Sequence, residues 1–191
     1  MNDNLIVNQR FENQNYTVKS LDRGVYEQCT FNECDFSDSD LSFIRFLECE
    51  FTECNLSMTK MGSTALQGVR FQDCKMLGLR FDHCDTFGFD VNFEICVLNL
   101  SSFYRTKLKN TSFKECLLRE VDFGECNLTG SIFDDCDLHR AIFDSTVLEK
   151  VDFRTAFNYS IDPANNKMKK AKFSIPQVKG LLDKYDIQID D

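Results

Sequence analysis

The sequence has few of the residues from which catalytic sites are usually built. Its 191 residues include only two histidines, His83 and His139, and each stands next to an acid or an arginine, as is typical of surface positions. The motifs G-x-G-x-x-G, G-x-x-x-x-G-K-[ST], G-x-S-x-G and H-E-x-x-H, which mark nucleotide, hydrolase and metalloprotease sites, are all missing. We therefore expect no enzyme activity and no cofactor.

Long apolar runs are also missing. A membrane-spanning helix needs about 20 consecutive apolar residues, and the chain has no run near that length. Residues 1–4 read Met-Asn-Asp-Asn, which is a polar beginning unlike a secretory signal. We expect a cytoplasmic protein that does not enter a membrane.

What the sequence does contain is a large apolar residue at every fifth position from residue 93 to residue 153. Phenylalanine and leucine alternate without a miss, and a small residue such as Ser101, Ala141 or Val151 stands two positions before each of them. The large residues are Phe93, Leu98, Phe103, Leu108, Phe113, Leu118, Phe123, Leu128, Phe133, Leu138, Phe143, Leu148 and Phe153.

A period of five excludes both a simple helix and a flat strand. A helix turns about 100° per residue, so positions five apart differ by about 140° and do not share a face. In a strand, an odd step sends successive residues to opposite faces. The chain must turn once per repeat, which describes a solenoid. Because Cys96, Cys116 and Cys136 are spaced by twenty residues, four five-residue sides make one coil.

The ten cysteines follow the same repeat. All of them occupy the small position that points inward, and none forms a C-x-x-C pair. Buried free cysteine behaves as a small apolar residue. We therefore expect these thiols to pack in the core, without disulfides or a bound metal.

The repeats resemble the A(D/N)LXX signature of the pentapeptide repeat proteins. The segments that carry the resemblance include Cys126-Asn127-Leu128-Thr129-Gly130, Cys136-Asp137-Leu138 and Val151-Asp152-Phe153. The resemblance covers residues 24–160 and implies an all-β solenoid, a right-handed quadrilateral β-helix. Residues 1–23 keep only a trace of the period, and we expect a degenerate first coil that caps the N-terminal strand edges.

The repeat register breaks once. Large residues fall on residue 81 minus multiples of five before the break and on residue 93 plus multiples of five after it. Two extra residues therefore lie within residues 82–92, and we place the loop at Phe87, Gly88, Phe89 and Asp90. These phenylalanines either contact a partner, since loops on rigid scaffolds often carry function, or turn inward to fill the core.

The net charge of −9 must be carried on the outside of the rod, because the inward positions are apolar or small. A regularly charged rod resembles duplex DNA electrostatically, although the acids could equally form an ordinary solvated surface. The sign of the charge disfavours direct binding to nucleic acid. The candidate acids stand two places after a large residue and are Glu33, Glu48, Glu53, Glu115, Glu120, Glu125 and Asp135.

Residues 161–191 depart from the repeat and predict a turn followed by a short amphipathic α-helix. Ser174 and Gln177 have the spacing of a capping box, and Pro176 suits the first helical turn. The apolar stripe either caps the last coil or pairs with a second copy to form a homodimer. The candidate interface residues are Val178, Leu181, Leu182, Tyr185 and Ile187.

Within the family, two stretches are similar to the topoisomerase-protecting members, the Qnr-type and albicidin-resistance proteins. They are residues 70–78, with the sequence RFQDCKMLG, and the tail from Tyr159 to Ile187. The similarity implies a DNA mimic that dimerises through its C-terminal helix and binds bacterial DNA gyrase or topoisomerase IV. The alternative is a scaffold of the same fold that binds a different protein.

Overall fold

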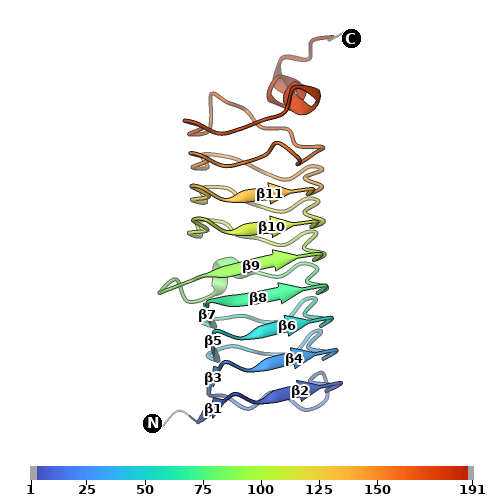
Figure 1. Ribbon diagram of the computed structural model, residues 1–191, viewed down its shortest axis with the longest axis vertical. Coiled ribbons are helices and arrows are strands. Elements are labelled where there is room, and N and C mark those ends of the chain that lie inside the picture. The colour runs from blue at the N-terminus through green and yellow to red at the C-terminus, as the bar shows by residue number, and fades with distance from the viewer. Residues whose placement is uncertain (1–3, 189–191) are drawn as a thin grey trace.

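The chain forms a straight rod with its two ends at opposite tips (Figure 1). This computed structural model describes residues 4–188. Short parallel strands stack along the rod, so the expected all-β solenoid is confirmed. Among residues 4–188, no helix is long and apolar enough to cross a membrane.

Two sides of the rod are built from regular strands. The first is a 4-stranded sheet in the order β1-β3-β5-β7. Its strands are β1 Leu5–Val7, β3 Val25–Glu27, β5 Arg45–Leu47 and β7 Ala65–Gln67. The second is a 7-stranded sheet in the order β11-β10-β9-β8-β6-β4-β2. Its strands are β2 Arg10–Glu12, β4 Thr30–Asn32, β6 Glu50–Thr52, β8 Val69–Gln72, β9 Val91–Glu94, β10 Ser112–Lys114 and β11 Ile132–Asp134.

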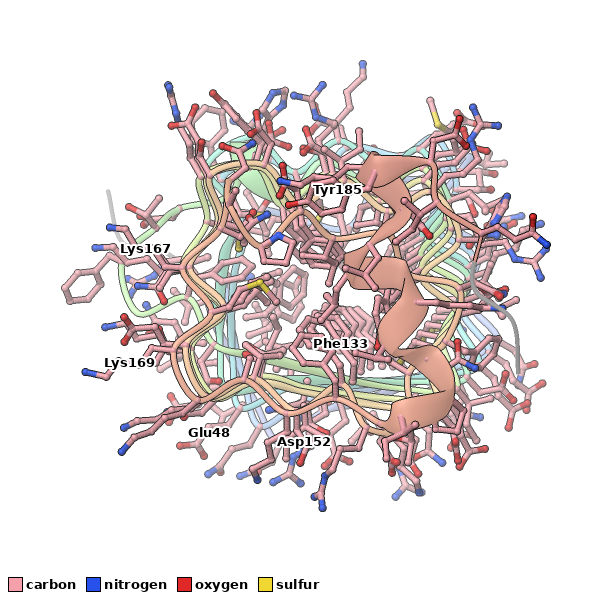
Figure 2. The ribbon with its side chains drawn as sticks, turned by 90° about the horizontal axis from the view of Figure 1, so that it is seen from above. Glu48, Phe133, Asp152, Lys167, Lys169 and Tyr185 are labelled. Carbon is pink, nitrogen blue, oxygen red and sulfur yellow. The ribbon has the colours of Figure 1, made fainter. Side chains whose placement is uncertain are left out.

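The other two sides are joined by isolated parallel bridges, such as Val97 with Leu117 and Ser102 with Asp122. The chain passes through the four sides in turn, and viewed along the rod it outlines a square (Figure 2). Partners in neighbouring coils are twenty residues apart, as in the pairing of Phe113 with Phe133. The quadrilateral β-helix with a twenty-residue coil is thus confirmed.

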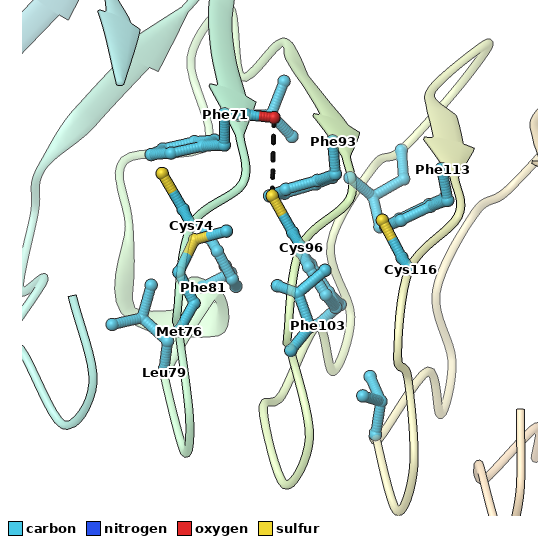
Figure 3. Packing of buried hydrophobic residues seen from close by; sticks show 14 of the residues in the cluster. Phe71, Cys74, Met76, Leu79, Phe81, Phe93, Cys96, Phe103, Phe113 and Cys116 are labelled. Atoms are coloured by element: carbon cyan, nitrogen blue, oxygen red, sulfur yellow. Dashed lines mark hydrogen bonds between the residues drawn. The ribbon is translucent and has the colours of Figure 1, made fainter. Parts of the chain in front are cut away.

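The inside of the rod is a set of stacked side-chain columns. Phe113 and Phe133 are parallel, with ring centroids 4.8 Å apart, and Phe123 meets Phe133 edge-on at 5.7 Å. Such edge-to-face contacts stabilise aromatic packing beyond the area they bury. All ten cysteines are free and buried in these columns, as expected, and the Cys96 thiol donates to the Phe71 carbonyl at 3.4 Å (Figure 3). Burial raises the pKa of Cys49 to about 12.

The predicted register break is present. Phe71 pairs with Phe93, so β8 and β9 are offset by 22 residues, whereas Phe51 pairs with Phe71 at the usual 20. The 3₁₀ helix η1, Phe81–His83, precedes the break, and the loop that follows it leaves the line of the coil beside β9 (Figure 1).

The C-terminal helix is present, but it is not the α-helix that the sequence pattern predicts. Two 3₁₀ helices follow one another, η2 Ile175–Leu181 and η3 Asp183–Tyr185. Ser174 makes no side-chain cap, so the capping box is absent. The packing of Gly180 explains part of the departure from the predicted α-helix, because a β-carbon there would lie 2.1 Å from the Tyr159 carbonyl oxygen. The helix is fitted tightly to the last coil, and that contact overrides the α-helical pattern.

Candidate protein-interaction surfaces

The candidate acids all occupy the corners of the coil. Each has a left-handed backbone, with φ between 50° for Asp135 and 57° for Glu120. Their backbone N–H groups tie neighbouring coils together, as where Glu33 donates to the Thr52 carbonyl at 3.0 Å and Glu115 to the Asp134 carbonyl at 2.7 Å. The side chains are exposed. The fold therefore holds the backbone of each acid at a fixed height on an edge of the rod.

Four of the seven candidate acids lie on the same edge, and the other three are scattered. Glu48, Glu120 and Glu125 lie on three different edges; Glu48 marks one of them in Figure 2. The sequence argument missed Asp73, which lies on the shared edge between Glu53 and Ile95 and donates to the Glu94 carbonyl. We define the acidic edge as Glu33, Glu53, Asp73, Glu115 and Asp135.

The acidic edge could have been found by following the twenty-residue coil through the register break. Glu33, Glu53 and Asp73 are spaced by twenty residues, the next corner is Ile95, and Glu115 and Asp135 continue the series. Ile95 alone interrupts the negative charge within this stretch. The spacing of neighbouring strands is about 4.8 Å, so the acids form a row with that spacing and a single gap at Ile95.

The acids differ in how far they are neutralised. Glu125, away from the acidic edge, accepts hydrogen bonds from Arg105 at 2.8 Å and from the Tyr104 hydroxyl at 2.6 Å. The bond from Arg105 is the main reason that the pKa of Glu125 is lowered. On the acidic edge, Glu115 lies 3.8 Å from the Lys114 ammonium. Among residues 4–188, the other four acids of this edge have no ion pair.

The loop at the register break separates its two phenylalanines. Phe87 is 78% exposed, whereas Phe89 is partly buried and meets the Phe81 ring edge-on at 6.5 Å. Gly88 has φ of +65°, and Asp90 donates its N–H to the Leu66 carbonyl at 2.9 Å. Of the four loop candidates, Phe89 thus fills the core and Phe87 is available to a partner.

The C-terminal candidates are also divided. Leu181 packs against the core, and Leu182 is half-buried. Val178, Tyr185 and Ile187 are 40%, 58% and 56% exposed. Three residues per turn of a 3₁₀ helix do not keep an α-helical stripe on one face. The helix therefore covers the last coil with one part of the stripe and presents the other part outward (Figure 2).

Within the part of the chain that the structure describes, no group of three or more His, Cys, Asp or Glu side chains could hold a metal ion. His83 lies on the surface, 3.8 Å from Asp82, and His139 is likewise exposed.

A family model described as "Pentapeptide repeat region" matches residues 26–88 and 87–159. A trypsin-treated variant of QnrB1, a plasmid-mediated fluoroquinolone resistance protein, has a similar structure, with a TM-score of 0.63 and 16% identity over 98% of this chain and 99% of that one. A second trypsin-treated QnrB1 variant has a TM-score of 0.52 and 17% identity over 98% and 100%. No curated protein matches the chain.

Proposed function

The chain belongs to the pentapeptide repeat proteins, and we propose that it is a non-enzymatic, cytoplasmic DNA mimic that binds a bacterial type II topoisomerase. In this proposal the protein occupies the DNA-binding surface of DNA gyrase or topoisomerase IV. It thereby protects the enzyme from an inhibitor of the quinolone or albicidin type.

The acidic edge is the observation that carries the proposal. Its five carboxylates lie on fixed backbone corners along one line of the rod. Duplex DNA carries one phosphate per about 3.4 Å along each strand, and stacked coils repeat at about 4.8 Å. A surface shaped to follow a phosphate strand therefore meets negative charges at a comparable spacing. The sequence similarity of residues 70–78 and of the tail to topoisomerase-protecting members agrees with this partner.

A homodimer fits the same proposal. The exposed apolar residues Val178, Tyr185 and Ile187 lie at the C-terminal tip of the rod. Two copies joined there would make a rod of twice the length, with an acidic edge in each half. The double rod would cover a longer part of an extended DNA-binding surface than one copy.

A second candidate is a scaffold that binds a different protein. On the next edge of the rod, Met58 and Leu100 are 60% and 61% exposed, with Gly78 between them. Leu117, on the adjoining side, is 38% exposed. Apolar patches on a soluble surface often mark contacts with a partner. This patch favours a partner whose surface is apolar rather than basic.

Gyrase supercoiling, measured with and without a quinolone, distinguishes the two candidates. The DNA-mimic proposal expects the purified protein to inhibit supercoiling or to relieve its inhibition by the drug. The effect should weaken as salt rises, because screening shortens the range of surface charges. If supercoiling and drug inhibition are both unchanged over a wide range of protein concentrations, the scaffold candidate is favoured.

A further inference from the structure

At the register break, a contact between neighbouring coils is open. On the side that contains β1, β3, β5 and β7, residues at equivalent positions in successive coils donate their backbone N–H to a carbonyl of the preceding coil. Ala65 donates to the Ile44 carbonyl at 3.0 Å and Asn127 to the Thr106 carbonyl at 2.9 Å, and Asp85 and Val147 do the same. Lys107 holds this place in the coil after the break. Within residues 4–188, its N–H has no partner.

The backbone carbonyl of Lys107 lacks its expected partner as well. Leu108 donates to the Asn127 carbonyl and Leu128 to the Val147 carbonyl, each at 2.8 Å. By this pattern Thr86 should donate to the Lys107 carbonyl, but no such bond forms in the described chain. The extra residues move the Thr86 segment outward, because Asp90 now supplies the N–H for the Leu66 carbonyl. Lys107 thus directs an unpaired N–H and an unpaired carbonyl toward the gap.

A cavity of about 270 Å³ occupies this gap. It is lined by Phe81, Cys84, Asp85, Thr86, Phe89, Arg105, Thr106 and Lys107. The rings of Phe81 and Phe89 supply an apolar wall. Small-molecule sites in proteins are typically about 300–1,000 Å³, mostly apolar, with a few placed polar groups. The lining fits this description, and the volume lies just below that range, which suits a small ligand.

The charged groups around the cavity nearly cancel. The Arg105 guanidinium is held by Glu125 at 2.8 Å, and the Asp85 carboxylate accepts the Phe87 N–H at 3.0 Å. The Lys107 ammonium has no ion pair among the described residues. With one acid and one unpaired base, side-chain charge gives no strong preference for an anion. The backbone donor and acceptor of Lys107 are therefore the more selective feature.

We propose that this cavity binds a small uncharged aromatic carboxamide. The aromatic ring lies against Phe81 and Phe89. The amide oxygen accepts the Lys107 N–H, and the amide NH₂ donates to the Lys107 carbonyl. A primary carboxamide presents an acceptor and a donor side by side, as the missing strand segment would have done. This site is independent of the proposed contact with a topoisomerase.

The probe is 2-naphthamide, followed by its fluorescence anisotropy. The protein contains no tryptophan, so the naphthyl signal is free of indole background. We expect saturable binding to the full chain. N,N-dimethyl-2-naphthamide, which keeps the ring and the oxygen but lacks the donor, should bind about tenfold more weakly, because it leaves the Lys107 carbonyl unpaired. Equal binding of the two amides, or no anisotropy change, overturns the proposal.

Two substitutions of Lys107 separate the contribution of its backbone N–H to ligand binding from that of its side chain. Lys107→Pro removes the unpaired N–H together with the ammonium group and should weaken 2-naphthamide binding about tenfold. Lys107→Gln removes the ammonium group alone and should leave binding within about twofold, because the N–H remains. If 2-naphthoate binds at least as tightly as the amide and Lys107→Gln abolishes it, the site is an anion site and the carboxamide assignment is wrong.

Cysteine alkylation provides a readout that needs no variant. Cys84 lines the cavity and is 7% exposed, whereas each of the other nine cysteines is at most 2% exposed. With iodoacetamide and peptide mass spectrometry, 2-naphthamide should slow the labelling of Cys84 and leave the other thiols unchanged. Labelling of Cys84 at the same rate with and without saturating probe contradicts binding in this cavity.

Discussion

At the scale of single residues, the coil corners impose a conformation that most side chains disfavour. A left-handed backbone costs an L-residue roughly 1–2 kcal/mol, and Asn and Asp tolerate it better than branched residues. Ile95 is β-branched, has φ of 56° and is 44% exposed, so little packing compensates for its strain. On the acidic edge, Ile95 is therefore the residue least suited to its backbone conformation.

We predict that Ile95→Asn raises the free energy of unfolding by about 0.5–1 kcal/mol, since asparagine adopts the left-handed conformation more readily. Denaturant titration measures the change. Ile132→Asn is the matched control, because Ile132 is similarly exposed, at 48%, but lies in β11. There the substitution should be destabilising, as asparagine is a poor strand residue. Stabilisation at both positions, or at neither, argues against corner strain.

Asp137 is a second residue whose environment predicts a measurable effect. Its carboxylate is 2% exposed and accepts from Arg119 at 2.7 Å and from Asn158 at 2.9 Å. Burial alone would raise the pKa of Asp137, but the hydrogen bonds from Asn158 and Arg119 outweigh it and lower the pKa. The folded state therefore binds this proton less readily than the unfolded chain, whose aspartates have a pKa near about 3.9.

Asp137→Asn should cost about 1–3 kcal/mol of stability at neutral pH, because it removes a charged acceptor of buried hydrogen bonds. The stabilisation is present above the unfolded pKa and is lost as pH falls through the lower folded pKa. The difference between wild type and variant should therefore narrow below about pH 4. Denaturant titrations from pH 7 to pH 3 test this, with exposed Asp135→Asn as the control. If the stability difference between wild type and Asp137→Asn does not change with pH, the lowered pKa of Asp137 is contradicted.

At the scale of structural elements, the loop at the register break combines a structural and an accessible phenylalanine. Phe89→Ala should lower the free energy of unfolding by about 2 kcal/mol, roughly half the value for a fully buried ring, because Phe89 is only partly buried against Phe81. Phe87→Ala should change it by less than about 0.5 kcal/mol. Thermal melts of the two variants test the division. Equal losses would mean that both rings are structural.

In the C-terminal helix, only the exposed residues are suitable for testing the proposed dimer. Leu181 covers the last coil, so a charge there would loosen the cap as well as any dimer. Val178→Asp combined with Ile187→Asp changes only exposed positions. We predict that this double variant is monomeric in light scattering while the wild type is dimeric. Val18→Asp, at the opposite tip and 89% exposed, should leave the mass unchanged. An unchanged mass for the double variant contradicts the proposed dimer.

At the scale of the whole molecule, the interior of the rod follows from the local repeat, whereas its edges have to be traced across the register break. Columns such as Phe113 and Phe133 follow directly from the twenty-residue spacing. The acidic edge depends also on where the two extra residues enter, since Asp73 and Glu115 share it only after that shift. The fit of the last helix to the coil depends on the close approach of Gly180 to Tyr159. Neither feature has a local sequence signal.

A DNA mimic acts through the whole rod, because its binding depends on where the charges lie and not only on how many there are. Two triple variants separate these effects. Glu33→Gln, Glu53→Gln and Asp73→Asn remove three charges from the acidic edge. Glu48→Gln, Glu120→Gln and Asp38→Asn remove three from other edges. All six residues are exposed corners with a left-handed backbone, so the two sets are matched in charge, residue type and conformation.

The most direct test of the central claim is the equilibrium binding of purified DNA gyrase to the wild type and to these two triple variants. Exposed ion pairs contribute about 0.2–1 kcal/mol each, so three lost contacts should weaken binding by a factor of about 3 to 150. The account predicts that loss for the acidic-edge variant, binding within about twofold for the scattered variant, and competition by duplex DNA. Equal weakening of both variants, or no binding of gyrase by the wild type, would contradict it.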